Sequence, residues 1–270
     1  MGKSAADEMI LSYNDVVLRR SDLEILGGPY FLNDRIIEFY FSILSSSHPS
    51  PDILLVSPSI AFWITNCPDV NDLKDFLEPL KLPDKNLVIF PVNNNDDVSL
   101  AEGGSHWSLL AYYRSADVFV HHDSNQQMNK RHAMKLYKSV VGYIRASSVG
   151  NDKYIECVET PQQINGYDCG LYVTATARTI CSWYESSESK NDKDLWISAV
   201  KDQVTPLATR KYMYAYGCVW KSRQRRQEQE SDRQVHENEG RNKSSRTRSR
   251  IGGVGFAGPA SISTGSPILN

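Results

Sequence analysis

The chain of 270 residues contains 40% hydrophobic residues, 10% aromatic residues and a formal net charge of −2, values that are ordinary for a globular protein. It has no apolar stretch long enough for a transmembrane helix, so we expect no membrane partner. Its five cysteines are odd in number and scattered without a Cys-x-x-Cys pair, which argues against a disulfide framework and a zinc ribbon and predicts a reducing compartment, the cytoplasm or the nucleus.

The first third of the chain is expected to be mostly helical. A Ser-x-x-Glu capping box over residues 21–24 predicts a short helix through Leu26, which the following Gly-Gly-Pro sequence would end. Asn33 and Asp34 can cap a longer helix, because apolar residues recur at helical spacing over residues 36–44. Two further helices are expected, one through about residue 65 with Ser57 as its N-cap and Pro58 as its first residue, and one from Asp69 to about Pro79.

The middle of the chain carries the strand signals. Residues 87–92 form a short apolar stretch that is typical of a buried strand. Residues 106–113 and 117–122 are apolar and aromatic segments separated by a short connection, which predicts an antiparallel hairpin. A helix over residues 132–145 and a strand over residues 154–158 follow. Strands in the centre with helices on either side of them in the sequence predict an α+β domain.

A turn-rich segment, residues 161–168, leads into Cys169 and then into an apolar stretch that predicts a helix over residues 171–184. A thiol at a helix N-terminus faces unpaired backbone N–H groups and the positive end of the helix dipole, which favour the thiolate. Gln163 lies six residues upstream and could turn its side-chain amide toward a developing oxyanion. Cys169 is therefore a candidate nucleophile that needs a histidine as its base.

His106 is the preferred base among the six histidines. It begins a predicted strand after residues 103–105, and Asp123 ends the next strand, so a tight hairpin would bring the two to neighbouring strand ends. The adjacent His121 and His122 suggest a metal site, but neighbouring residues of a strand point to opposite faces. The sequence holds no other ligand cluster, so we expect no metal.

Each of these residues also has a plain structural interpretation. A lone cysteine before an apolar helix is more often a small buried hydrophobe than a nucleophile, and a histidine beside a tryptophan is more often a packed or surface residue. The Asn165-Gly166 pair alone is an ordinary turn. Their combination at these spacings is what favours a catalytic site.

The combination resembles the ubiquitin-like-protein-specific cysteine proteases, which include the SUMO-specific (sentrin-specific) enzymes. The resemblance covers residues 10–205 and implies a papain-like α+β fold with a central mixed sheet flanked by helices. Within this family the chain looks most like a plant deneddylase, an enzyme specific for the modifier called NEDD or RUB. The motifs that carry the resemblance are His106-Trp107, Asp123-Ser124, Pro161 to Gly170 with Tyr167, and residues 76–83 and 103–110.

The resemblance also implies the roles of the catalytic residues. Cys169 matches the nucleophile, His106 the general base, and Asp123 the carboxylate that orients the base. Gln163 matches the amide that stabilises the oxyanion together with the backbone N–H of Cys169. No cofactor is implied.

A narrow passage for a Gly-Gly tail is the next feature that the resemblance implies. Trp107 matches one aromatic wall of this passage. Residues 31–34 align with the motif that supplies the other wall, and Asn33 and Asp34 match further substrate-binding positions. Phe31 stands where relatives usually have tryptophan, so the wall stays aromatic but offers less contact area.

The activity implied is cleavage after the C-terminal Gly-Gly of a NEDD/RUB-type modifier, in its precursor or in conjugates such as cullins, by a monomeric enzyme. Three other functions remain open: a SUMO-specific protease, an acetyltransferase with the same Cys/His geometry, and a catalytically impaired protein that only binds the modifier. An unrelated globular protein that merely contains these residues is the fourth.

The chain changes character after Thr205, where the resemblance stops. Residues 206–220 are an aromatic-rich extension without a clear period, and residues 221–270 are expected to be disordered because they are basic, low in complexity and poor in apolar pattern. Residues 221–250 carry a net charge of +5, which leaves −7 on residues 1–220. An acidic body argues against nucleic acid as the main ligand.

Overall fold

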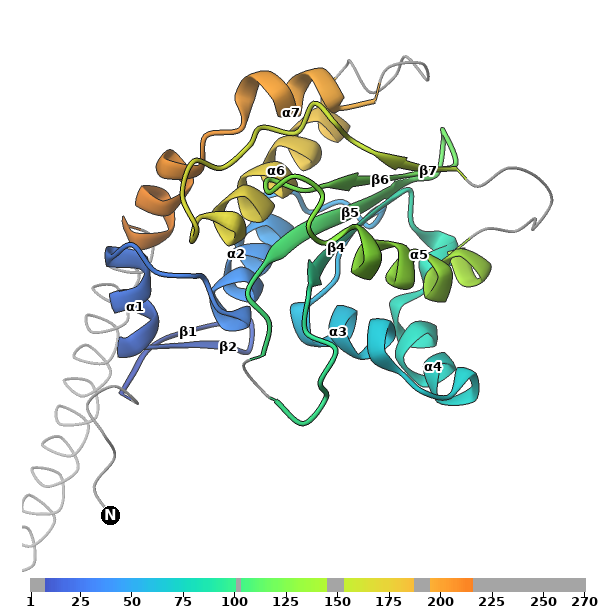
Figure 1. Ribbon diagram of the computed structural model, residues 1–270, viewed down its shortest axis with the longest axis horizontal. Coiled ribbons are helices and arrows are strands. Elements are labelled where there is room, and N and C mark those ends of the chain that lie inside the picture. Colours follow the sequence, from blue (N-terminus) through green and yellow to red (C-terminus); the bar gives the residue numbers. More distant parts are fainter. Residues whose placement is uncertain (1–7, 101–102, 145–152, 187–194, 216–270) are drawn as a thin grey trace, which may run out of the picture. The chain divides into compact units, whose positions relative to one another are not determined.

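Residues 8–100, 103–144, 153–186 and 195–215 are described in the computed structural model of the chain. Their centre is a five-stranded sheet with strand order β3-β4-β5-β6-β7 (Figure 1). The outer pairs, β3–β4 and β6–β7, are parallel, and the inner pairs are antiparallel. The sheet is therefore mixed, as the resemblance implied. Its strands are Ile53–Leu55 (β3), Leu87–Asn93 (β4), Trp107–Tyr113 (β5), Val118–His122 (β6) and Tyr154–Glu156 (β7).

Helices cover both faces of this sheet because its central strands are apolar on both sides. In β4, Leu87 and Ile89 belong to one hydrophobic cluster, and Val88 and Phe90 belong to the other. Helices α2, α6 and α7 pack on the first face, and α3, α4 and α5 pack on the second (Figure 1). The helices are Asp34–Ser47 (α2), Pro58–Asn66 (α3), Val70–Leu77 (α4), Lys130–Ile144 (α5), Cys169–Glu185 (α6) and Ile197–Gln203 (α7), with short 3-10 turns at Glu78–Leu80 and Leu82–Asp84. The α+β fold is confirmed.

The predicted helix starts are confirmed where a polar side chain caps the first turn. The side chain of Asn33 accepts a hydrogen bond from the backbone N–H of Ile36 at 3.0 Å, and α2 begins one residue later. Ser57 accepts from the N–H of Ile60 at 3.4 Å, with Pro58 as the first residue of α3. Capping chemistry readable in the sequence thus fixes where these two helices enter the fold.

The N-terminal segment differs from the prediction. Strands β1 (Met9–Tyr13) and β2 (Val16–Arg19) form an antiparallel hairpin that was not predicted. The short strand β3 was not predicted either. The capping box of helix α1 (Arg20–Gly27) lies two residues earlier than expected. Asp22 accepts the backbone N–H of Arg19 at 2.7 Å, whereas Glu24 was expected to accept that of Ser21. Asp22 is selected because it is buried and also binds Asn33 and Arg35.

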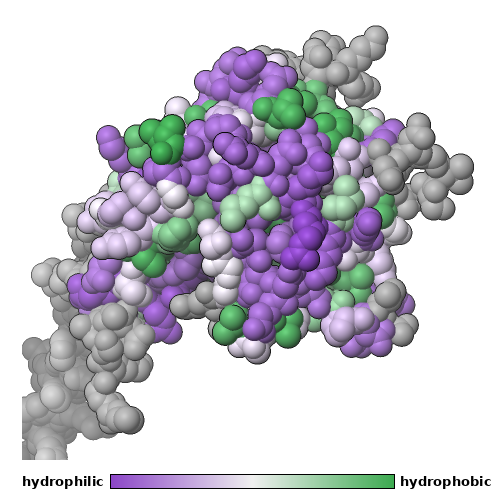
Figure 2. All heavy atoms as spheres, in the orientation of Figure 1, coloured by the Kyte–Doolittle hydropathy of each residue, from purple (hydrophilic) through white to green (hydrophobic). Residues whose placement is uncertain are grey.

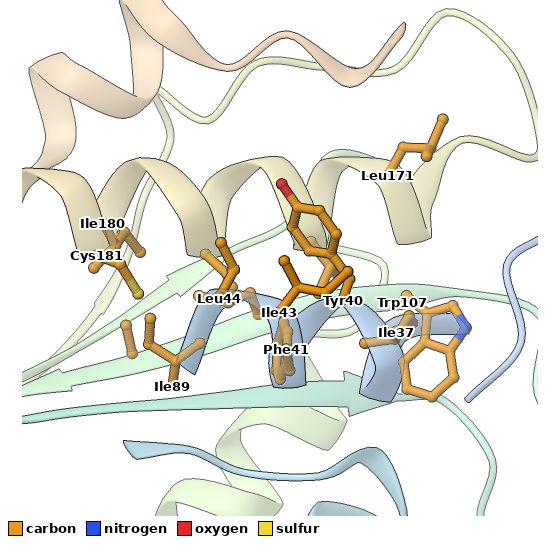
Figure 3. Packing of buried hydrophobic residues seen from close by; sticks show 14 of the residues in the cluster. Ile37, Tyr40, Phe41, Ile43, Leu44, Ile89, Trp107, Leu171, Ile180 and Cys181 are labelled. Atoms are coloured by element: carbon orange, nitrogen blue, oxygen red, sulfur yellow. The ribbon is translucent and has the colours of Figure 1, made fainter. Parts of the chain in front are cut away.

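The core between α2, α6 and the sheet reaches the edge at which the candidate site lies. Figure 3 shows Ile37, Tyr40 and Ile180 packed between the two helices and β4–β5, with Trp107 at one end of the cluster. On the face of the molecule that Figure 2 shows, hydrophobic residues occur only in small groups within a hydrophilic surface. Most apolar side chains are therefore committed to the two cores that hold the sheet and its helices together.

The chain continues as a helix beyond the predicted end of the family-like sequence. Residues 206–215 are helical, and two of them, Thr209 and Met213, are fully buried. The ring of Tyr212 meets that of Tyr40 edge-on, with centroids 6.3 Å apart. The boundary at Thr205 stays a prediction of sequence similarity, but the residues directly after it pack on the domain. The predicted disordered segment, 221–270, lies outside the described residues, and no helix among the described residues is long and apolar enough to span a bilayer.

Candidate active site

The predicted nucleophile is the first residue of α6. Asp168 is the N-cap, and Cys169 is completely buried at the first helical position, where a backbone N–H has no partner within the helix. The turn before it is held by Asn165, whose side-chain oxygen accepts the backbone N–H groups of Tyr167 at 3.1 Å and Asp168 at 3.0 Å. This local structure is the predicted Asn-Gly turn, and the cysteine that follows it is shielded from solvent.

His106 and Asp123 meet where the predicted hairpin places them. His106 directly precedes β5, Asp123 directly follows β6, and the ring nitrogen Nε2 of His106 lies 2.6 Å from Oδ1 of Asp123. Burial alone lowers the pKa of His106, but hydrogen bonds and charges from Asp123 and Cys169 outweigh it and raise the pKa to about 9. Because Asp123 occupies Nε2, Nδ1 is the ring nitrogen left for Cys169. His106 is thus placed between a carboxylate and a thiol.

The carboxylate of Asp123 is fixed by more than the histidine. Its Oδ1 accepts the backbone N–H of Asn125 and its Oδ2 that of Asn129, each at 2.8 Å. Burial raises the pKa of Asp123, but the hydrogen bond from His106 and those backbone donors lower it below its ordinary value. Asn129, which is fully buried, also donates its side-chain amide to the backbone carbonyl of His106 at 3.2 Å. One asparagine therefore holds both members of the pair in register.

Gln163 lies beside the same strand end. Its backbone N–H donates to the carbonyl of Ser124 at 2.8 Å, and its side-chain Oε1 accepts the Ser124 hydroxyl at 2.8 Å. Its side-chain Nε2 donates to the carbonyl of Asn165 at 2.7 Å. An amide nitrogen carries two hydrogens, so one donor remains for a substrate oxygen. The preceding Gln162 donates to the carbonyl of Asp123 at 3.0 Å, which ties the loop before Cys169 to the loop after β6.

A groove of about 270 Å³ is lined by His106 and Trp107 and by residues 31–34. Phe31 is half exposed at this groove, whereas Trp107 is buried and its indole N–H donates to the carbonyl of Leu32 at 3.1 Å. The two predicted aromatic walls are therefore brought together. Asp34 also lines the groove, while both ends of the Asn33 amide are used inside the chain, by Asp22 and Ile36.

Two glycines let the walls approach. A Cβ built on Gly170 would lie 2.8 Å from the Cβ of Leu32, so only glycine permits the start of α6 to touch this wall so closely. Gly104, on the groove's other rim, has φ +85°, a conformation that other residues adopt with strain. At both positions a larger residue would therefore disturb the backbone next to the candidate site.

The adjacent histidines do not form a metal site. His121 lies between Glu156 (2.7 Å) and Ser108 (2.9 Å), whereas His122 lies on the opposite face between Thr160 (2.9 Å) and Trp196 (2.8 Å). Within the part of the chain that the structure describes, no group of three or more His, Cys, Asp or Glu side chains could hold a metal ion. Strand alternation, as predicted from the sequence, separates the two rings.

Sequence reasoning missed several residues that support the site. Asn129, Ser124 and Gln162 each form a hydrogen bond to one of the predicted catalytic residues. Their role is to hold these residues in place. The doubled glutamine at 162–163 and the serine directly after Asp123 were visible signals. Asn129 gave none, because its role depends on how α5 meets the hairpin.

Comparisons with known proteins identify the family of the chain. The sequence model of the family described as "Ulp1 protease family, C-terminal catalytic domain" matches residues 30–203. The chain is 56% identical over 207 residues to NEDD8-specific protease 1 of Arabidopsis thaliana, covering 77% of this chain and 90% of that protein. It is 36% identical over 179 residues to sentrin-specific protease 8 of Rattus norvegicus, covering 65% of this chain and 80% of the relative.

A solved structure described as a de-sumoylating protease shares the fold, with a TM-score of 0.60 and 18% sequence identity, and covers 82% of this chain and 94% of its own. The matched family segment includes the groove, the buried His106–Asp123 pair and Cys169. The resemblance to a plant deneddylase is confirmed by the Arabidopsis relative. The chain belongs to the Ulp1 protease family of cysteine peptidases.

Proposed function

We propose that this protein cleaves the bond that follows the C-terminal Gly-Gly of a NEDD8/RUB-type modifier. The observation that carries the proposal is the His106–Asp123 pair, 2.6 Å apart, facing Cys169 at the end of a narrow groove with aromatic walls. The choice of modifier is supported by the 56% identity to a relative named a NEDD8-specific protease, against 18% to a structure named a de-sumoylating protease.

The reaction begins when Nδ1 of His106 takes the proton of the Cys169 thiol, which makes the sulfur a nucleophile. Sulfur attacks the carbonyl carbon of the last glycine, and the new oxyanion accepts hydrogen bonds from Gln163 and the backbone N–H of Cys169. The C–N bond then breaks, and His106 gives its proton to the leaving amine. Because the pKa of His106 is raised to about 9, this proton is in place at neutral pH.

Hydrolysis of the thioester completes the cycle. The now neutral His106 takes a proton from water, whose oxygen attacks the thioester carbonyl, and the bond to sulfur breaks. The products are the modifier with a free C-terminal carboxylate and the regenerated Cys169. Asp123 keeps the imidazole oriented through both steps.

The groove accounts for the requirement for glycine. Phe31 and Trp107 both line the groove, and Gly170 approaches Leu32 closely. A residue with a Cβ would have to displace one of these walls, whereas glycine leaves the space free. The same passage accepts a peptide bond in a precursor or an isopeptide bond on a lysine, so conjugates such as cullins are substrates in this proposal, with a monomeric enzyme.

The test uses three modifiers, NEDD8, SUMO and ubiquitin, each carrying an electrophile at its C-terminus. The wild-type protein should form a covalent adduct with the NEDD8 probe at least about 10-fold faster than with the other two. Cys169→Ala should form none and should still bind NEDD8 noncovalently. Intact mass spectrometry measures the adduct.

Each other outcome selects a different function. Faster reaction with the SUMO probe would replace the modifier and keep the chemistry. Binding of NEDD8 without any adduct, from folded protein, would favour a protein that only binds the modifier. Transfer of an acetyl group from acetyl-coenzyme A, with no reaction at any probe, would favour the acetyltransferase.

A further inference from the structure

Arg210 lies in the helix after the predicted end of the family-like sequence, and its side chain reaches two separate parts of the site. Its Nη1 donates to the backbone carbonyls of Ile25 at 3.0 Å and Gly28 at 2.6 Å, and its Nη2 donates to that of Tyr30 at 3.2 Å. Figure 1 shows residues 206–215, in orange, beside α1 in dark blue. Arg210 thus holds the backbone that leads directly into the groove wall at Phe31.

The same guanidinium also binds the loop that carries the nucleophile. Nη2 of Arg210 lies 3.0 Å from Oδ1 of Asp168, the residue before Cys169, and both side chains are largely buried, at 13% and 7% exposure. Burial removes water from both partners of an ion pair. The pair is stable only when protein donors and acceptors replace the lost hydrogen bonds, which demands a specific geometry. Four acceptors from two segments meet this one fork of donors.

The contact extends from Asp168 to the oxyanion side of the site. The other oxygen of Asp168 accepts the side-chain amide of Asn165 at 2.8 Å, and the carbonyl of Asn165 accepts Nε2 of Gln163 at 2.7 Å. A chain of hydrogen bonds therefore joins Arg210 to the amide that would stabilise the oxyanion. Through its other donors the same residue joins the opposite wall of the groove.

We propose that Arg210 is a positioning residue that sets the distance between the Phe31 wall and the loop carrying Gln163 and Cys169. The proposal rests on the proposed function, since it assigns Arg210 a part in presenting the modifier's tail. Capping the end of α1 explains its contacts to Ile25 and Gly28, but not the contact to Asp168. That fourth contact is what makes Arg210 a bridge.

Only an arginine side chain has the geometry that these contacts require. Lysine keeps the charge and can pair with Asp168, but a single ammonium cannot reach Gly28, Tyr30 and Asp168 together as a planar fork does. We therefore expect Arg210→Lys and Arg210→Gln to have similar defects. Both should lower kcat/KM for cleavage of a NEDD8 fusion by about 10- to 100-fold, through a raised KM and a lowered kcat, because tail and oxyanion donor both lose their alignment.

Lys211→Gln is the matched control, because it removes a cation from the next residue of the same helix, whose side chain is exposed. It should leave kcat and KM unchanged. Alkylation of Cys169 by iodoacetamide should be as fast in Arg210→Gln as in wild type, or faster, since a small electrophile does not need the Phe31 wall to align it. A variant that has merely unfolded would instead lose its cooperative denaturation transition, which is measured on the same samples.

A double-mutant cycle with Phe31→Ala separates positioning from general stability. If Arg210 acts through the Phe31 wall, Arg210→Gln should cost much less in the Phe31→Ala background than in wild type. Wild-type kinetic constants in Arg210→Gln, full recovery in Arg210→Lys, or additive effects in the cycle would each overturn the proposal. Failure of the wild-type protein to cleave any modifier would instead refute the proposed function, so the two failures are distinct.

Discussion

Two buried histidines, His106 and His122, lie at the same end of neighbouring strands and have opposite acid–base properties. Their exposed fractions are nearly equal, 2% and 3%. The pKa of His106 is raised to about 9, whereas burial, and to a lesser extent the nearby His121, lowers the pKa of His122 to about 3. Burial lowers the pKa of both rings, but only His106 has partners that outweigh it. The charge of the partners therefore makes the difference.

The partners of His122 leave no room for a second proton. The indole N–H of Trp196 can only donate, so Nε2 of His122 must accept, at 2.8 Å. Nδ1 then carries the hydrogen and donates to the Thr160 hydroxyl at 2.9 Å, which in turn donates to the carbonyl of Cys157. All hydrogens of this neutral network are assigned. His106, between a carboxylate and a thiol, has partners that gain from its charge.

The largest effect should separate the two histidines by activity. His106→Gln removes the group that holds the transferable proton and should lower kcat for a NEDD8 fusion by about 10⁴-fold or more. His122→Gln should retain activity within about threefold, because a glutamine amide can accept from Trp196 and donate to Thr160. Steady-state cleavage by both purified variants measures the contrast. Equal losses would show that the two histidines are not functionally different.

The next prediction removes the charge that distinguishes them. Asp123→Asn should lower kcat/KM by about 10²- to 10³-fold and should move the alkaline limb of the pH profile from near 9 toward lower pH. The reason is that the pKa of His106 falls when the carboxylate is lost, so its proton dissociates earlier as the pH rises. Asp84→Asn, an exposed site at the opposite end of β4, is the control and should not shift the profile. An unshifted profile in Asp123→Asn would remove Asp123 as the cause.

Stability should respond to pH in opposite directions through the two rings. The lowered pKa of His122 gives a contribution that is present above about pH 6.5 and is lost as the pH falls toward 3, and amounts to about 2 kcal/mol between pH 7 and pH 5. The raised pKa of His106 gives a contribution that is complete below about pH 6.5 and is lost as the pH rises through 9. Urea denaturation of wild type, His122→Gln and His106→Gln at pH 5, 7 and 9 measures both.

In that experiment each variant should lose a different part of the pH dependence of the unfolding free energy. His122→Gln should lose about 2 kcal/mol of the acid-side dependence and keep the alkaline-side dependence. His106→Gln should show the reverse. If His122→Gln retained the full acid-side slope, His122 would not be the buried neutral group described above.

The sequence predicted those parts of the fold whose signals are local. The hairpin that joins His106 to Asp123 was readable from two apolar segments and a short connection, and the caps at Asn33 and Ser57 were readable from residue type. The short strand β3 was not, because three residues give no period and its partner β4 lies more than thirty residues along the chain. The cap of α1 was misplaced because Asp22 is chosen by its distant partners Asn33 and Arg35.

The same distinction holds within the site. Cys169, His106, Asp123 and Gln163 could be proposed because their chemistry is rare in combination, and resemblance to a family fixed the pairing. Arg210 could not, since an arginine in an unpatterned segment gives no sign of which carbonyls it will meet. Nor could the opposite pKa shifts of His106 and His122, which depend on partners supplied by α6, by the Asp123 loop and by Trp196.

The smallest expected effect tests whether the hydrogens around His122 are assigned correctly. Thr160→Val keeps the shape of the side chain but removes the acceptor of the Nδ1–H, which leaves a buried donor without a partner and should cost about 1 kcal/mol of unfolding free energy. Thr160→Ser retains the hydroxyl and should cost clearly less. Because Thr160 precedes the loop of Gln162 and Gln163 without touching the reacting groups, kcat should stay within about twofold in both variants. An equal loss of stability in both variants would attribute the effect to lost methyl packing or to the backbone. The assignment of the Nδ1–H of His122 to the Thr160 hydroxyl would then be wrong.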